Sequence, residues 1–122
     1  MRRTTPAVLA VAALGLLPGE ALAAATINAS PNPIHAGKRV HLFGNVGGGC
    51  APGGQVTLMS FAFSHKHEFA GVPAVFARVK SNGNYSKRTR IPKSRTPKKY
   101  GISARCGGGN FGITRKLRVL AA

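Results

Sequence analysis

Acidic residues are almost absent from this sequence. Its 122 residues contain no aspartate and only two glutamates, Glu20 and Glu68, against 18 lysines and arginines, so that the formal net charge is +16. Hydrolysis by paired carboxylates needs two acids in one site, and a Ser-His-Asp triad needs an acid to orient its histidine. Glu68 is the only acid beyond residue 23, so neither mechanism is available there. We therefore expect a protein that is not an enzyme and that has no cofactor.

Long hydrophobic runs are also missing. The longest uncharged apolar run, residues 7–17, is too short for a bilayer span, which takes about 20 residues. Two arginines precede this run, and Ala21-Leu22-Ala23 follows it with the small-x-small pattern that signal peptidase recognises. We predict that residues 1–23 are a signal peptide, cleaved after Ala23 or else one or two residues later. The protein is then secreted and has no transmembrane segment.

Cysteine is as scarce as acid, because Cys50 and Cys106 are the only two. Residues 24–122 are enough for one domain with a modest core. An oxidising compartment favours pairing of the two cysteines, with two free thiols as the alternative. A disulfide that closes a loop of this length contributes on the order of 4 kcal/mol in the chain-entropy model.

Helical periodicity is absent as well, and short alternating segments between turns take its place. The predicted strands are residues 26–29, 39–45, 55–60, 74–80, 85–91, 100–106 and 113–120. Asn82-Gly83 is a strong hairpin signal and predicts that strand 74–80 pairs with strand 85–91. The side chains predicted to face the core are Val40, Leu42, Val56, Leu58, Val75, Ala77, Val79, Tyr100, Ile102, Ala104, Leu117 and Val119. Seven such strands with frequent turns predict an all-β fold, a β-sandwich.

Three segments resemble the signatures of secreted bacterial immunoglobulin-like domains: "ASPNPIHAGKRVHLFGNVGGGCAPGGQVTL", "VKSNGNYS" and "KKYGISARC". In that family a Pro-bounded first strand, a Gly-rich turn, an Asn-Gly hairpin and a Tyr-led penultimate strand follow one another in this order. The resemblance covers essentially all of residues 24–122. It implies an immunoglobulin-like β-sandwich of about seven antiparallel strands with one disulfide. In strand order and compact size the chain is also similar to the neocarzinostatin-type chromophore-carrying proteins.

Each cysteine lies in a glycine-rich segment, the first "NVGGGCAPGG" and the second "RCGGGNFG". A nucleotide-binding P-loop needs Lys and Ser or Thr directly after its glycines, but the first segment continues into a strand without lysine. In an immunoglobulin-type sandwich the two cysteine-bearing loops share one pole, where glycine permits close backbone approach. We interpret the two segments as halves of one structural clamp.

The segment "FAFSHKHEF", residues 61–69, concentrates phenylalanine and histidine. An extended conformation would place its three phenylalanines, His65 and His67 on one face. The two histidines are a candidate chelate for Cu²⁺ or Zn²⁺, with His35 as a third ligand. The alternative is a partly buried aromatic edge strand, because Lys66 and the local positive charge oppose a bound cation.

Most of the cations lie in the second half of the chain. Thirteen of the sixteen lysines and arginines beyond residue 23 fall between Arg78 and Arg118. Such a field attracts nucleic acid, wall polymers, acidic polysaccharide or anionic lipid. Only Tyr85 and Tyr100 interleave with these cations, so we expect diffuse, salt-sensitive attraction and no sequence-specific recognition of nucleic acid. The predicted polyanion-binding residues are Arg78, Lys80, Arg88, Arg90, Lys93, Arg95, Lys98 and Lys99.

These observations predict a secreted, monomeric, non-catalytic binding or accessory module. Its expected partner is an anionic cell-wall or extracellular polymer. One alternative is a carrier of a small ligand or of copper or zinc that uses residues 61–69. A second alternative is a purely structural extracellular protein, which would show neither salt-sensitive retention nor metal uptake.

Overall fold

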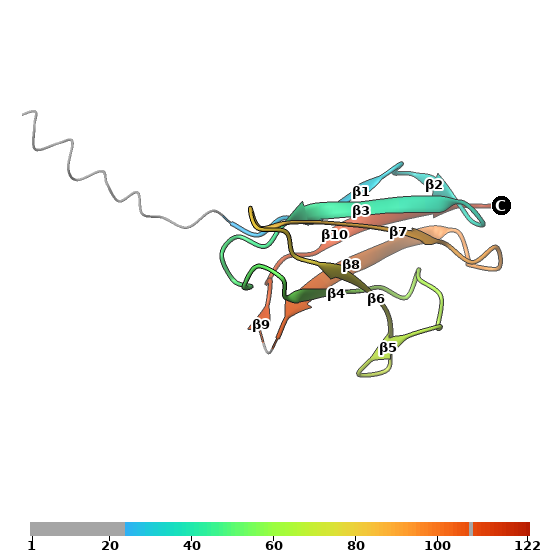
Figure 1. Cartoon of the computed structure of the whole chain (residues 1–122). Coiled ribbons are helices and arrows are strands. Elements are labelled where there is room, and N and C mark those ends of the chain that lie inside the picture. Colours follow the sequence, from blue (N-terminus) through green and yellow to red (C-terminus); the bar gives the residue numbers. More distant parts are fainter. Residues whose placement is uncertain (1–23, 108) are drawn as a thin grey trace, which may run out of the picture.

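The computed structural model describes residues 24–107 and 109–122, which form strands and connecting turns without a helix. Figure 1 labels the strands. They are β1 (Asn28–Ser30), β2 (Ile34–His35), β3 (Arg39–Asn45), β4 (Gln55–Met59), β5 (Glu68–Phe69), β6 (Val72–Arg78), β7 (Asn84–Arg90), β8 (Lys98–Cys106), β9 (Gly109–Asn110) and β10 (Arg115–Leu120). Each of the seven predicted strands is present, and the three additional strands are two residues long. The predicted signal peptide, residues 1–23, lies outside the described residues.

The strands form two sheets (Figure 1). One sheet has the order β1-β3-β7, and the other has the order β2-β10-β8-β4-β6-β5, with β9 paired to β8. Neighbouring strands are antiparallel except β10 and β2, which are parallel. In the described part of the chain, no helix is long and apolar enough to cross a membrane.

Alternating side chains from both sheets meet in one hydrophobic core. Of the residues predicted to face inward, Val40, Leu42, Val56, Leu58, Ile102, Ala104, Leu117 and Val119 are fully buried, and Ala77, Val79 and Tyr100 are nearly so. Val75 is only partly buried and packs against the edge of this core. The period of two in these strands places every second side chain on the same face, which is why the sequence pattern predicts the core well.

The predicted hairpin between β6 and β7 is wrong. The turn itself forms, because the amide of Gly83 donates to the carbonyl of Lys80 at 2.9 Å. Beyond the turn, β6 pairs with β4 and β7 pairs with β3, so the two strands enter different sheets. Their apolar faces are buried across the core instead of lying side by side in one sheet. Consecutive strands therefore leave an open edge between the two layers.

The different strand pairing also changes which residues lie beside the cationic side chains. A hairpin of β6 and β7 would have placed Arg78 and Lys80 opposite Arg88 and Arg90. Strands β6 and β7 belong to different sheets, so these pairs do not form. Arg88 is instead the register partner of His41, and Arg90 is the partner of Arg39 on β3.

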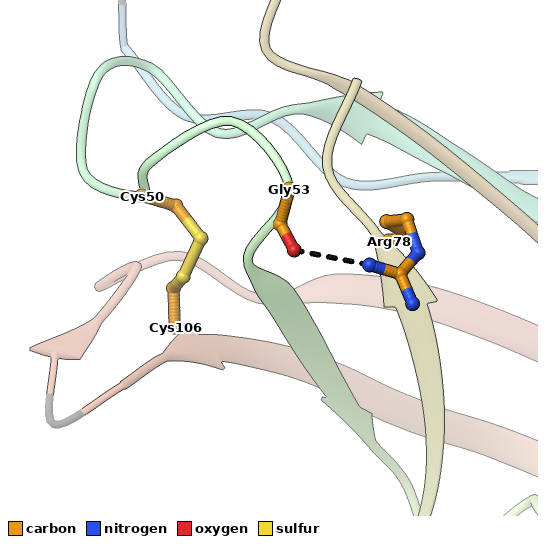
Figure 2. Close-up of a disulfide and its surroundings, with 4 residues drawn as sticks. All are labelled: Cys50, Gly53, Arg78 and Cys106. Atoms are coloured by element: carbon orange, nitrogen blue, oxygen red, sulfur yellow. Dashed lines mark hydrogen bonds between the residues drawn. A yellow bond between two sulfur atoms is a disulfide. The ribbon is translucent and has the colours of Figure 1, made fainter. Parts of the chain in front are cut away.

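The disulfide between Cys50 and Cys106 is present, as predicted (Figure 2). It joins the β3–β4 loop to the last residue of β8, with the two Cα atoms 5.7 Å apart. A Cβ atom on Gly54 would lie 3.3 Å from the Cys50 sulfur and 2.9 Å from the carbonyl oxygen of Ala51. Glycine is therefore required for close approach beside the bridge, which supports the clamp interpretation.

Candidate anion-binding groove

A groove of about 400 Å³ lies at the open edge between the two sheets. Its walls are β6, β7 and the segment that connects β4 to β5. Five cationic side chains line it: Arg39, Lys66, Lys87, Arg88 and Arg90. Ala74, Val75 and Phe76 of β6 form an apolar surface in the same groove, and Ser64, His67 and Thr89 add polar groups.

Four of the five cations come from two neighbouring strands. Lys87 shares its side of β7 with the buried Tyr85, whereas Arg88 and Arg90 are on the other side of the strand. All three line the groove because β7 has a partner on one side only, so its free edge admits side chains from both faces. Arg39 joins them because it lies opposite Arg90 in the β3–β7 ladder.

The fifth cation, Lys66, and His67 reach the groove through a folded connection. The amide of Phe63 donates to the carbonyl of Ser60 at 3.1 Å, and the amide of Lys66 donates to the Ser64 hydroxyl at 3.1 Å. The amide of Ala74 donates to the carbonyl of His67 at 2.8 Å, which ties the end of the connection to β6. These hydrogen bonds turn residues 60–67 back over the edge of the sheet.

Arg95, one of the predicted polyanion-binding residues, holds this connection in place. Its guanidinium donates to the carbonyl oxygens of Phe63 at 2.6 Å and Ala62 at 3.3 Å. Phe63 is fully buried, so the segment is fixed on one side by the core and on the other by Arg95. The loop before β8 and residues 62–63 are therefore in contact, and Arg95 has a structural role in this contact.

Two aromatic rings accompany the cations. The His67 and Phe76 rings lie with their centroids 5.6 Å apart and their planes inclined at 55°. Phe76 is partly exposed on the opposite side of β6 from the core-facing Val75 and Ala77. The sequence gives no sign of this interleaving, because Phe76 and the groove cations are neighbours in space and not along the chain.

No carboxylate lines the groove. Glu68 is the only acidic residue in the described ranges, and it pairs with His65, whose Nδ1 lies 2.9 Å from the Glu68 carboxylate. The five like charges therefore repel one another, and no carboxylate of the groove lining offsets them. A bound anion relieves that repulsion, and the concave wall concentrates the positive field.

The other predicted polyanion-binding residues are scattered. Arg78 donates to the carbonyl of Gly53 at 3.3 Å near the disulfide (Figure 2). Lys80 lines a smaller cleft together with the stacked rings of His41 and Phe43. Lys93, Lys98 and Lys99 are exposed in and after the β7–β8 connection. Of the eight predicted residues only Arg88 and Arg90 line the groove, whereas Arg39, Lys66 and Lys87 were missed.

The three histidines of the candidate metal site are not brought together. Among residues 24–107 and 109–122, no group of three or more His, Cys, Asp or Glu side chains is arranged to hold a metal ion. His35 Nδ1 lies 2.7 Å from the carbonyl oxygen of Ala121, His65 pairs with Glu68, and His67 contacts Phe76.

The shared aromatic face expected for residues 61–69 is also absent. The segment is built of turns up to β5, so its side chains do not alternate as they would in a strand. Phe61 is 59 % exposed and Phe69 is 38 % exposed, whereas Phe63 is fully buried. Only Glu68 and Phe69 form the predicted edge strand, against Pro73 and Val72.

No family model, no curated protein and no solved structure matches this chain.

Proposed function

We propose that this chain is a non-catalytic binding module that associates with anionic extracellular polymers through the groove between β6 and β7. The observation that carries the proposal is the convergence of five cationic side chains, without a carboxylate, on a single groove of about 400 Å³. A polymer suits the site better than a single small anion, because it offers several negative charges at once to the five cations of the groove. Neutralisation of several polymer charges releases counterions and makes binding strongly dependent on salt.

The scaffold of the proposed module is an immunoglobulin-like β-sandwich. The Tyr100 hydroxyl donates to the carbonyl of Thr96, four residues upstream, at 2.7 Å. A tyrosine with this hydrogen bond near the start of the penultimate long strand is characteristic of immunoglobulin-like domains. The division of the consecutive strands β6 and β7 between two sheets also supports this assignment.

The module acts as a secreted monomer in this proposal. Charged side chains on β7 oppose edge-to-edge pairing with another copy, because like charges would be brought together. Secretion depends on cleavage of residues 1–23. Expression in a bacterial host, followed by intact-mass measurement of the exported protein, tests this part. A mature chain that begins at Ala24, or at one of the next two residues, supports it, and an uncleaved intracellular chain contradicts it.

The binding site is tested with labelled heparin at increasing salt. We expect the Lys87→Gln/Arg88→Gln variant to lose about tenfold or more in affinity at low ionic strength, because charge-assisted contacts to polymer anions are lost. We also expect the slope of log affinity against log salt to become shallower by about two charges.

The matched control is Lys116→Gln/Arg118→Gln, which removes the same charge from exposed positions of β10. It should lose much less affinity than the groove variant. Equal losses would mean that heparin senses only the overall charge of the domain. Failure of the parent protein to bind heparin or any other polyanion tested at low salt would contradict the proposed function altogether.

A further inference from the structure

We infer that the groove takes single-stranded nucleic acid, with a base stacked on Phe76 and phosphates held by the surrounding cations. This inference rests on the proposed function and names the class of polymer. Proteins that bind single strands without sequence preference combine two features, a positive groove along the backbone and aromatic rings on which bases stack. Both features are present here within one groove.

The aromatic part consists of Phe76 and His67. Phe76 is partly exposed on β6, and it is flanked in the groove by the exposed His67 at a centroid distance of 5.6 Å. Every base has a π-face, so stacking on such a ring tolerates any sequence. A sulfated polysaccharide has no aromatic ring, so it could contact this surface only through sugar C–H groups and not by π-stacking.

The cationic part is richer in arginine than in lysine. Arg39, Arg88 and Arg90 supply three planar guanidinium groups, which bind phosphate oxygens in a bidentate manner. Arg90 also donates to the carbonyl of Gly37 at 2.7 Å, so its head group is held in place before any ligand arrives. Lys66 and Lys87 add point charges on either side of the groove.

The size and polarity of the groove favour a single strand over a duplex. A volume of about 400 Å³ lies within the range of small-molecule sites. The faces of the bases are covered in a duplex by neighbouring base pairs, so they are not available to Phe76. No asparagine, glutamine or carboxylate lines the groove, so the side chains that pair with adenine and cytosine edges are missing from it.

The test compares two labelled probes by fluorescence anisotropy, a thymidine oligonucleotide and an abasic oligodeoxynucleotide of equal length. A length of about 12 nucleotides lies within the site sizes known for single-strand binders. The parent protein should bind the thymidine probe about fivefold or more tightly than the abasic probe, because only the former has bases to stack. Phe76→Leu should bind the thymidine probe no more tightly than the abasic probe. Its affinity for the abasic probe should equal that of the parent protein.

Two further variants make the result specific to the groove. Phe61→Leu changes a more exposed phenylalanine that does not line the groove, and it should keep the parent preference. His67→Ala should reduce the preference, and it provides a second test if Phe76→Leu does not fold. Equal binding of the two probes by the parent would overturn the inference. If heparin binds and the oligonucleotides do not, the inference fails while the proposed function stands. If none of the three probes binds, both are contradicted.

Discussion

The Tyr85 hydroxyl donates a hydrogen bond to the carbonyl oxygen of Thr26 at 2.7 Å, across 59 residues of sequence. This bond ties the segment before β1 to β7. Strand β3 lies between β1 and β7 in the sheet and pairs with each of them. The Tyr85 ring is almost completely buried and meets Phe111 edge-on at 6.3 Å. Tyr85 lies between cations along the sequence, but its side chain belongs to the hydrophobic core.

Removal of the Tyr85 hydroxyl should weaken the fold. We expect Tyr85→Phe to lower the free energy of unfolding by about 1 kcal/mol at neutral pH, the usual net contribution of a protein hydrogen bond. The ring packing is retained, so the loss should not approach that of a large-to-small core substitution. Urea denaturation of the two proteins measures the difference.

The same residue should make stability decrease at alkaline pH. Burial raises the pKa of the Tyr85 hydroxyl well above its usual range. Above a pH of about 10 the unfolded chain loses this proton while the folded chain keeps it, so the free energy of unfolding falls by about 1.4 kcal/mol per pH unit from this group. Lysine titration is common to the parent and Tyr85→Phe, so the difference between their pH profiles isolates the tyrosine. Parallel profiles would contradict the assignment.

Gly44 should not tolerate a side chain. A Cβ atom there would lie 2.8 Å from the Tyr85 hydroxyl oxygen and 2.9 Å from the carbonyl carbon of Thr26. Gly44→Ala must therefore displace backbone as well as the Tyr85 bond, and we expect a loss of about 1–3 kcal/mol in unfolding free energy. Gly49→Ala is the control, because the nearest atom to its Cβ would be 3.6 Å away. Thermal unfolding that is the same for both variants would refute this prediction.

The disulfide should stabilise the fold without contributing to polymer binding. The bridge spans 56 residues, and its removal in Cys50→Ala/Cys106→Ala should cost on the order of 4 kcal/mol. No groove residue lies in the cleft that Cys50 lines, so heparin affinity of the folded variant should remain within about twofold of the parent value. Chemical denaturation and heparin titration are measured on the same preparation. A parallel fall in stability and affinity would place the binding site at the disulfide end.

Arg95 should influence the groove indirectly. Its two hydrogen bonds hold residues 62 and 63, next to the part of the connection that carries Ser64, Lys66 and His67. We expect Arg95→Gln to increase amide hydrogen exchange in residues 60–67 and to weaken heparin binding more than Lys93→Gln does. Lys93 is exposed and carries the same charge, so it serves as the matched control. Equal effects of the two substitutions would mean that Arg95 acts only through its charge.

Local pattern predicted the strands and their buried faces. Val56 and Leu58 on β4, and Ile102 and Ala104 on β8, alternate with polar residues, and all four are fully buried. The same reasoning failed at residues 61–69, where alternate aromatic side chains suggested an extended strand. Hydrogen bonds to the Ser60 and Ser64 hydroxyls form turns there instead, and such local side-chain bonds compete with sheet pairing.

For the candidate site, the sequence indicated the class of ligand that we propose but little of where the site lies. Positive charge is a sum over residues, so the attraction to polyanions follows from composition. Arg88 and Arg90 were identified, but the other cations of the groove lie at positions 39, 66 and 87, and no short motif connects them.

What the amino-acid sequence determined by itself was the class of fold, the core-facing residues and the pairing of its only two cysteines, because these depend on periodicity and composition. Only the tertiary structure decided that β6 and β7 belong to different sheets. That choice follows from the burial of two apolar faces against one core, a long-range requirement that overrides the local Asn82-Gly83 turn signal. The groove exists because of it, since pairing of β6 with β7 would have closed the edge at which Phe76 and the five cations now meet.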